Sequence, residues 1–405
     1  MTRNNMTKPN HFCEVNDLEP FVNSLQDIRH RIHQNPEMAY EEFETASLVA
    51  DYLSQWGYQV TTGVGGTGVV GTLKLGSNQK SIGIRADMDA LPIQENTGLS
   101  YASIKPGTMH ACGHDGHTTM LLGAARYLAA TRNFSGTLQL YFQPAEERGF
   151  DSGAKRMVED GLFERFPCDA VFGIHNHPGV APGTFMFRSG PFMSASDKVI
   201  ISIYGNGGHA ARPHLCIDPI IVGSNIVLAL QTIVSRNIDP IQPAVITVGS
   251  FNSGIANNVI PASATLELSV RSFNEKVRAQ LRERIEALVH AQAKSYGATA
   301  EIIYQEGYPL IDNDAKETAF AIDVARELVG ENSLIVNADM MMTSEDFAYM
   351  LQKKPGCFLR LGNGIGESGC PVHNPKYDFN DLNLPIGAAY WARLVERFLA
   401  YEDEI

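Results

Sequence analysis

The sequence predicts an α/β catalytic domain, with a central mixed sheet flanked by helices, that carries an inserted ferredoxin-like α+β lid domain. Three observations lead to this fold class. The 405-residue chain exceeds the roughly 250–300 residues at which single cores stop growing, so two domains are expected. Strand-like apolar runs alternate with helical patterns near both ends of the chain. The middle has the order β-α-β-β-α-β, which is typical of a self-sufficient two-layer unit.

Helical spacing of apolar residues and short apolar runs mark the elements of the first region. The first ~16 residues are polar, and we expect them to be disordered. The predicted helices are 18–34, 45–56 and 117–130, and the predicted strands are 67–75, 81–86, 137–142 and 170–174.

The second domain is predicted over 190–304, inserted into a first domain of 17–189 and 305–405. Its strands are 198–204, 244–251, 265–272 and 299–304, and its helices are 217–236 and 275–296. The tail alternates again over 316–329, 333–337, 344–353, 356–361 and 384–401. We expect this tail to return to the first sheet and to bring His373 with it.

Composition restricts the function. The hydrophobic fraction of 44% and the charged fraction of 19% are ordinary for a soluble enzyme, and a net charge of −13 argues against nucleic-acid or anionic-membrane partners. Six cysteines are too sparse for a disulfide framework, and the start lacks an apolar signal core, so we expect a cytoplasmic protein. The most apolar stretch, 217–234, contains Asp218, Asn225 and Gln231 and fits a buried helix better than a membrane span.

Three strand patterns end in side chains that can bind metal or transfer protons. Strand 81–86 runs into Asp87 and Asp89, strand 137–142 into Glu146 and Glu147, and strand 170–174 into His175 and His177. Open α/β sheets place their sites at such carboxyl ends. The loop 108–117 adds His110, Cys112, His114, Asp115 and His117, a set that suits a soft divalent metal.

These residue types suit hydrolysis of an amide. Two cations about 3.5–4 Å apart can lower the pKa of a bridging water and hold the carbonyl oxygen. The available ligands are Cys112, His114, Glu146 or Glu147, His175 and His373. One of the adjacent glutamates can bind metal while its neighbour acts as the general base. Simpler readings also exist: Cys112 as a structural cysteine, His110 and His117 as loop-structuring residues, His177 as a pocket-lining residue, and Met340–Met342 as core packing.

Several motifs in order resemble the dinuclear metal amidohydrolases that include hippurate hydrolase, indole-acetyl-amino-acid hydrolases and N-acyl-amino-acid hydrolases, relatives of aminoacylase. The resemblance covers nearly the whole chain. The motifs are RHRIHQNPE (29–37), RADMDALP (85–92), MHACGHD (109–115), QPAEE (143–147), GGHAA (207–211), NVIP (258–261), SEDF (344–347) and HNPKYDFND (373–381).

The resemblance implies a role for each matching residue. The metal ligands would be Cys112, His114, Glu147, His175 and His373, with Cys112 shared between two divalent ions (Zn, Mn, Co or Ni) per subunit. Glu146 would activate the bridging water and then protonate the departing amine. His209 in the lid would reach the scissile carbonyl, from its own or a partner subunit, and Asn258 and Arg271 would hold the substrate carboxylate. Asp87 and Asp89 would support the ligands without binding metal themselves.

The family implies a small N-acyl or N-aroyl amino acid as the substrate and a homodimer or higher oligomer formed through the lid. Two positions depart from its pattern: Arg148 stands where glycine is expected, and His177 stands where hippurate hydrolases usually have tryptophan. Both put substrate preference in question. Three alternatives stay open: a thiol hydrolase that uses Cys112 with His114, a non-catalytic ligand-binding relative, and a dipeptidase or aminopeptidase of the same superfamily.

Overall fold

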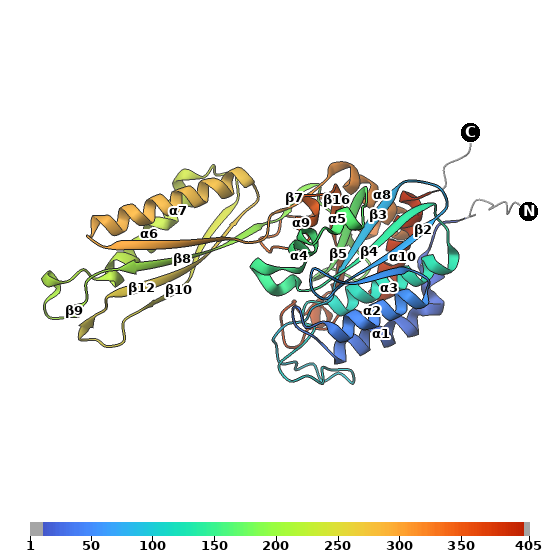
Figure 1. Ribbon diagram of the computed structural model, residues 1–405, viewed down its shortest axis with the longest axis horizontal. Coiled ribbons are helices and arrows are strands. Elements are labelled where there is room, and N and C mark those ends of the chain that lie inside the picture. The colour runs from blue at the N-terminus through green and yellow to red at the C-terminus, as the bar shows by residue number, and fades with distance from the viewer. Residues whose placement is uncertain (1–10, 401–405) are drawn as a thin grey trace, which may run out of the picture. The chain divides into compact units, whose positions relative to one another are not determined.

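The computed structural model describes residues 11–400, which form two compact units (Figure 1). Unit 1 comprises the chain up to Gly190, Asp312–Asp339 and the part from Asp346 onward. Unit 2 comprises Pro191–Ile311 and Met340–Glu345. Unit 2 is therefore longer than the predicted insert of 190–304 and takes in a short segment of the tail. Its role as a lid stays a prediction.

The centre of unit 1 is an eight-stranded sheet of mixed direction. In spatial order its strands are β1 (Gln59–Val64), β2 (Gly68–Leu75), β4 (Gly136–Gln143), β3 (Ser81–Asp87), β5 (Ala170–Pro178), β16 (Gly356–Gly364), β6 (Phe185–Met186) and β15 (Leu334–Ile335). The pairs from β4 through β3 and β5 to β16 are parallel, whereas β1, β2 and β4 pair antiparallel. The carboxyl ends of β3, β4 and β5 therefore meet at one edge.

Helices flank this sheet. The larger ones are α1 (Val22–Gln34), α2 (Phe43–Gln55), α3 (His114–Thr131), α8 (Ala315–Val329) and α10 (Asn383–Phe398). Helices α1, α2, α3 and α10 pack together, and the short α4 (Gly153–Glu159), α5 (Leu162–Arg165) and α9 (Ala348–Leu351) form a separate group (Figure 1). Helix α10 packs against the sheet and its neighbouring helices through one apolar face. Its residues Leu384, Ala388, Trp391 and Val395 lie at helical spacing, and all four are fully buried in the main core. The predicted mixed sheet with flanking helices is confirmed.

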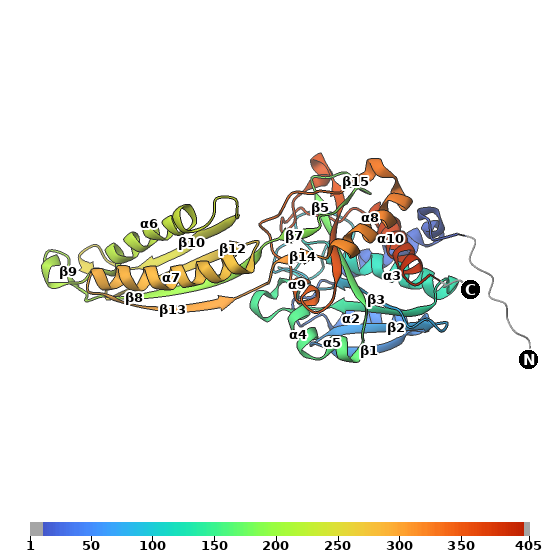
Figure 2. The same cartoon turned by 90° about the horizontal axis from the view of Figure 1, so that it is seen from above.

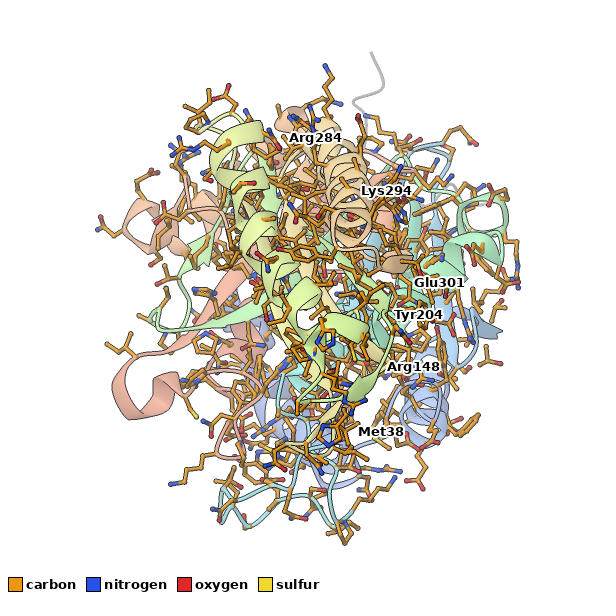
Figure 3. All side chains as sticks on the ribbon, turned by 90° about the vertical axis from the view of Figure 1, so that its left-hand side faces the viewer. Met38, Arg148, Tyr204, Arg284, Lys294 and Glu301 are labelled. Carbon is orange, nitrogen blue, oxygen red and sulfur yellow. The ribbon has the colours of Figure 1, made fainter. Side chains whose placement is uncertain are left out.

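Unit 2 is a four-stranded antiparallel sheet covered on one face by two helices (Figure 2). The strands in spatial order are β10 (Ala244–Ser253), β12 (Ser263–Ser272), β8 (Ala195–Tyr204) and β13 (Thr299–Glu306), and the helices are α6 (Pro219–Asn237) and α7 (Glu275–Ser295). This chain order and strand order are those of a ferredoxin-like unit. Strand β8 alternates between core and surface, because Val199, Ile201 and Ile203 face the helices. On the other face of the sheet, the Tyr204 hydroxyl lies 3.2 Å from a Glu301 oxygen, and Figure 3 shows the two side chains together.

Among the described residues, α6 is the helix that is long and apolar enough to cross a membrane by length and composition. Its Val222, Ile226, Leu230 and Ile233 are buried against the sheet of unit 2. The six cysteines are all free. No disulfide therefore contributes to the stability of the described part of the chain.

Some predicted boundaries differ from the structure. Residues 1–10 of the expected disordered start lie outside the described part, but Cys13 is fully buried and a 3-10 helix begins at Val15. The prediction of disorder was therefore wrong for residues 11–16. Helix α3 begins at His114 rather than at residue 117, because Gly113 adopts a left-handed conformation (φ 94°) immediately before it. The predicted element 344–353 shrinks to α9, since the Asp346 carboxylate accepts hydrogen bonds from Arg85 and Gln143.

Candidate metal centre

The loop before α3 presents His114 with one ring nitrogen available. His114 Nδ1 lies 2.8 Å from the Asp89 carbonyl oxygen and 3.1 Å from its Oδ1, so Nδ1 carries the proton and donates it. In the neutral ring Nε2 therefore holds the lone pair, and this atom is buried without a hydrogen-bond partner among the described residues. Burial disfavours the charged ring, but Asp87 and Asp89 outweigh burial and raise the pKa of His114 to about 10, so a metal ion at Nε2 would displace a proton. A buried imidazole fixed on one side and open on the other is the arrangement of a metal-ligating histidine. These residues thus fit a metal ion on the evidence of their own geometry.

Cys112 and His175 face each other across the carboxyl end of β5. The Sγ atom of Cys112 is 3.3 Å from His175 Nε2, while His175 Nδ1 donates to the Asn176 carbonyl at 2.7 Å. Burial and then the charges of Glu147 and Glu146 raise the pKa of the Cys112 thiol well above its usual value. Burial, assisted by Arg360, lowers the pKa of His175 and keeps its imidazole neutral. A thiolate here needs a cation to stabilise it, which argues against a free thiol nucleophile.

Glu146 and Glu147 follow a strained turn at the end of β4. Ala145 has φ 52°, a left-handed conformation that is unusual for a residue with a Cβ atom, and its N–H donates to a Glu42 oxygen at 2.8 Å. The Glu147 N–H donates to Asp89 Oδ2 at 2.9 Å. Asp89 thus holds both His114 and the Glu147 backbone. These two hydrogen bonds fix the backbone of the turn from which the side chains of Glu146 and Glu147 project.

His373 arrives from the tail and contacts Glu147. Its Nε2 is 2.9 Å from Glu147 Oε1, and this hydrogen bond is the main cause of its raised pKa. The His373 N–H donates to the Ala111 carbonyl at 2.7 Å, with His373 in a left-handed conformation (φ 63°). The tail is thereby bonded to the loop that carries Cys112.

Three groups of ligand atoms form in this way, and within each group all atoms lie within 4.8 Å of one another. They are Cys112 with His114 and His175, Cys112 with Glu147 and His373, and His114 with Glu146 and Glu147. Unit 1 therefore brings together all five predicted ligands and the predicted base. Cys112 belongs to two of the groups, as a ligand shared between two ions would.

His117 is held differently. Its Nδ1–H donates to Asp87 Oδ1 at 2.7 Å, and its Nε2 accepts the Asn176 N–H at 3.0 Å. Although Asp87, His114 and His117 lie close enough to form a further group, both nitrogens of His117 are occupied. Asp87 also accepts from Arg85 Nη1 at 2.7 Å. Asp87 and His117 therefore support the site without a free ligand atom on His117.

The guanidinium group of Arg360, on β16, lies beside the candidate metal centre. Its Nη1 is 3.1 Å from His175 Nδ1 and 3.3 Å from the Asn176 carbonyl oxygen. Burial and Arg360 lower the pKa of half-buried His177 to about 4, so that His177 is neutral at pH 7. Arg360 was not predicted from the sequence. The signal was available, because a single charged residue interrupts the otherwise uncharged strand Gly356–Gly364.

The predicted substrate-binding residues of unit 2 lie in two separate places. His209 on β9 (Gly208–His209) pairs with Val259 on β11 (Val259–Ile260), next to Asn258, and both His209 and Asn258 are exposed. Arg271 lies near the other end of β12, where it donates to the Met342 carbonyl at 2.6 Å. Eight residues of strand, about 26 Å at 3.3 Å per residue, separate Ser263 from Arg271. A single chain therefore does not bring Asn258 and Arg271 to one carboxylate, and their shared role in substrate binding stays a prediction.

His209 nevertheless has the protonation pattern of a hydrogen-bond donor. Its Nδ1 accepts the Ala211 N–H at 3.1 Å, so in the neutral ring the proton is on Nε2. This tautomer is opposite to that of His114. It presents an N–H group, which suits a carbonyl oxygen rather than a metal ion.

Comparisons with known proteins show the family of the chain. The model of peptidase family M20/M25/M40 matches residues 83–397. The chain is 45% identical over 386 residues to a hippurate hydrolase of Campylobacter jejuni, covering 95% of this chain and 98% of that enzyme. It is 38% identical over 388 residues to thermostable carboxypeptidase 1 of Saccharolobus solfataricus, covering 95% and 97%.

A solved structure of the M20 family is also similar to this chain. The YXEP protein of Bacillus subtilis, described as a dinuclear metal binding peptidase from the M20 family, has a TM-score of 0.81 with this chain at 32% identity. The match covers 94% of this chain and 99% of the other. The family match and the identity over nearly full length lead to one conclusion: the chain belongs to peptidase family M20/M25/M40.

Proposed function

We propose that this protein is a metal-dependent amidohydrolase that splits an N-acyl or N-aroyl amino acid into a carboxylic acid and a free amino acid. The observation that carries the proposal is the convergence in unit 1 of Cys112, His114, Glu147, His175 and His373, with Glu146 beside His114 and Glu147. The similarity to a hippurate hydrolase supports this substrate class, since hippurate is an N-aroyl amino acid.

The five ligands are expected to hold two divalent ions per subunit. The mixed sulfur, nitrogen and oxygen donors are compatible with Zn, Mn, Co or Ni. When bound, the ions supply a water of lowered pKa and polarise the scissile carbonyl. The family relationship supports metal binding, and the identity of the metal is part of the proposal.

Glu146 is proposed to move the protons. Its buried carboxylate accepts a proton from the attacking water and then delivers it to the nitrogen of the departing amino acid, so that the amine leaves neutral. Its neighbour Glu147 is held by Asp89 and His373. Two adjacent carboxylates thus have separate tasks.

The residues of unit 2 are proposed to bind the substrate. His209, with its proton on Nε2, would donate to the scissile carbonyl oxygen, and Asn258 and Arg271 would bind the substrate carboxylate. Because Arg271 lies far along the sheet from His209 and Asn258, we propose that two subunits contribute these groups to one site. This requires a homodimer or higher oligomer through unit 2. The cytoplasmic location predicted from the sequence is retained as part of the proposal.

A peptidase remains the second candidate function, and the similarity to a carboxypeptidase favours testing it. A peptide bond next to a free C-terminal carboxylate has the same leaving group as an N-acyl amino acid. The two functions differ in what the acyl side carries, which is a free amino group in a dipeptide.

A substrate panel with chelation tests the proposal. Amino-acid release is measured from benzoyl-glycine, indole-acetyl-aspartate, acetyl-methionine and a plain dipeptide, before and after chelator treatment and after Mn²⁺ or Zn²⁺ is added back. Turnover of an N-acyl substrate that chelation abolishes reversibly is the expected result. Cleavage of the dipeptide alone would favour the peptidase, and activity that ignores the chelator would overturn the metal mechanism.

A further inference from the structure

Asn176, the residue after His175, makes a contact with each neighbouring ligand-bearing segment. It lies at the carboxyl end of β5 and is fully buried. Its side-chain Nδ2 donates to the Cys112 carbonyl at 2.5 Å, and its Oδ1 accepts from the Tyr377 hydroxyl at 2.8 Å. Both polar atoms of the amide are therefore satisfied by residues far away in the sequence.

The backbone N–H of Asn176 forms a hydrogen bond outside the sheet. The pairing of β3 with β5 ends at Arg85 and Gly173, so β3 offers no partner to the N–H of Asn176. His117 accepts this N–H at 3.0 Å and is itself held by Asp87. The end of β5 is thus bonded to α3, which begins with His114.

Close packing around the amide shows that its position is restricted. A Cβ atom on Gly113 would lie 2.4 Å from Asn176 Nδ2 and 2.5 Å from the Tyr377 hydroxyl. Glycine is thus required at residue 113 both by this contact and by its left-handed conformation. Tyr377 is fully buried and follows His373 by four residues. The loop, the strand end and the tail therefore meet at one side-chain amide.

We propose that Asn176 is a positioning residue that sets the relative placement of Cys112, His175 and the His373 segment, and thereby controls how tightly the centre retains metal. The amide suits this role because the Cys112 carbonyl needs a donor and the Tyr377 hydroxyl needs an acceptor. Aspartate offers no donor and would set an anionic oxygen against the carbonyl. The inference rests on the proposed function, in which the ligands bind metal. Asn176 itself is not proposed to bind metal.

Residues that hydrogen-bond to ligand segments commonly change metal affinity by about 10- to 100-fold when they are replaced. We expect a loss of this size for Asn176→Ala and at least as large a loss for Asn176→Asp. Tyr377→Phe removes a single hydrogen bond to the amide, and we expect a loss of about threefold to tenfold.

Asn383→Ala is the matched control. Asn383 is equally buried, its Oδ1 accepts the Gly183 N–H at 3.0 Å, and its Nδ2 donates to the Gly362 carbonyl at 2.8 Å. It therefore joins backbone segments as Asn176 does, but it contacts no predicted ligand segment. Its variant reports the cost of losing a buried amide that lies away from the centre.

The experiment measures Zn²⁺ affinity of the full-length chain by competition with a chromophoric chelator, and the absorption of the Co²⁺ form, which reports the bond to the Cys112 thiolate. Thermal unfolding of each metal-free variant checks its folding. The expected result is weakened Zn²⁺ binding and an altered Co²⁺ spectrum for Asn176→Ala, with wild-type binding for Asn383→Ala.

Two results overturn the inference while the proposed function stands: Asn176→Ala binds Zn²⁺ as tightly as wild type, or it loses no more affinity than Asn383→Ala. If Asn176→Ala does not fold, Tyr377→Phe decides, and unchanged Zn²⁺ affinity in that variant overturns the inference. Failure of the wild-type protein to bind Zn²⁺ or Co²⁺ contradicts the proposed metal centre itself and is therefore distinguishable.

Discussion

His114 in unit 1 and His209 in unit 2 both follow a glycine, yet the two surroundings differ in almost every respect. His114 is fully buried, and its Nδ1 is fixed by Asp89, so the neutral ring has its lone pair on Nε2. His209 is exposed, and the Ala211 N–H bonded to its Nδ1 leaves the proton on Nε2. One ring is prepared to bind a cation and the other to donate a hydrogen bond.

The residues around the two histidines differ as well. The candidate ligands of unit 1 are held by hydrogen bonds within one chain, buried at His114 and His175 and partly exposed at Glu147 and His373, so this centre is preorganised. In unit 2, Arg271 lies near one end of β12, whereas His209 is on β9, which pairs with β11 directly after Asn258. Strand β9 lies beyond the other end of the four-stranded sheet (Figure 1). We therefore expect unit 1 of a single chain to suffice for metal binding. Turnover should also depend on the residues of unit 2 and on a second subunit.

The largest expected effect separates metal binding from turnover within unit 1. Glu146→Gln keeps the size of the side chain but removes the proton acceptor, and general acid–base groups are worth about 10²- to 10⁴-fold in rate. We expect turnover of the best N-acyl substrate to fall by that factor with the metal content unchanged. Steady-state kinetics and elemental analysis check this, with exposed Glu164→Gln as the control. A mutant with near-normal turnover would remove Glu146 from the mechanism.

A somewhat smaller effect is expected in unit 2. His209→Ala removes one donor to the carbonyl oxygen, which is worth about 10²- to 10³-fold in turnover, and should leave metal affinity as in wild type. His214→Ala, at an exposed position five residues away, is the control. If two subunits share a site, mixing inactive His209→Ala with inactive Glu146→Gln should restore part of the activity. Absence of any recovery in confirmed mixed dimers would contradict the sharing of sites.

The smallest expected effect is on thermal stability, and it concerns His33, which hydrogen-bonds to Asp115 in the first turn of α3. Burial disfavours the charged form of His33, but hydrogen bonds with Asp115 (2.8 Å) and Glu95 (3.4 Å) outweigh it and raise its pKa to about 9. A folded-state pKa above the unfolded value means that the stabilisation is complete below about pH 6.5 and is lost as the pH rises through 9. The metal-free wild type should therefore unfold several degrees above His33→Gln at pH 6, with the gap closing by pH 10. A gap that does not change with pH would show that His33 is neutral when folded.

The sequence pointed to the candidate ligands because each lies at a strand end, on the Gly-rich loop, or in the HNP motif of the tail. The parallel strands then bring these ends to one edge of the sheet. Both long helices of unit 2 were found from their apolar spacing. Strand β1 was missed because Gln59–Val64 has only one fully buried residue and lies at the edge of the sheet.

Other features depend on tertiary contacts that no pattern of spacing reveals. Asn176 is a polar residue at a strand end like many others, and its role depends on the Cys112 carbonyl and Tyr377, which lie 64 and 201 residues away. The separation of Asn258 from Arg271 follows from the length of strand β12, which the motifs do not encode. The order of motifs identified the residues, but it did not show which of them one chain brings together.

The most direct test of the account is the metal content of the purified wild-type and Cys112→Ala proteins, measured by elemental analysis after equilibration with Zn²⁺ or Mn²⁺ and paired with hydrolysis of the best N-acyl substrate. We predict about two ions per wild-type chain, and for Cys112→Ala a loss of metal together with activity, because Cys112 belongs to two of the ligand groups. Equal metal content and near-normal turnover in the two proteins would contradict the dinuclear centre.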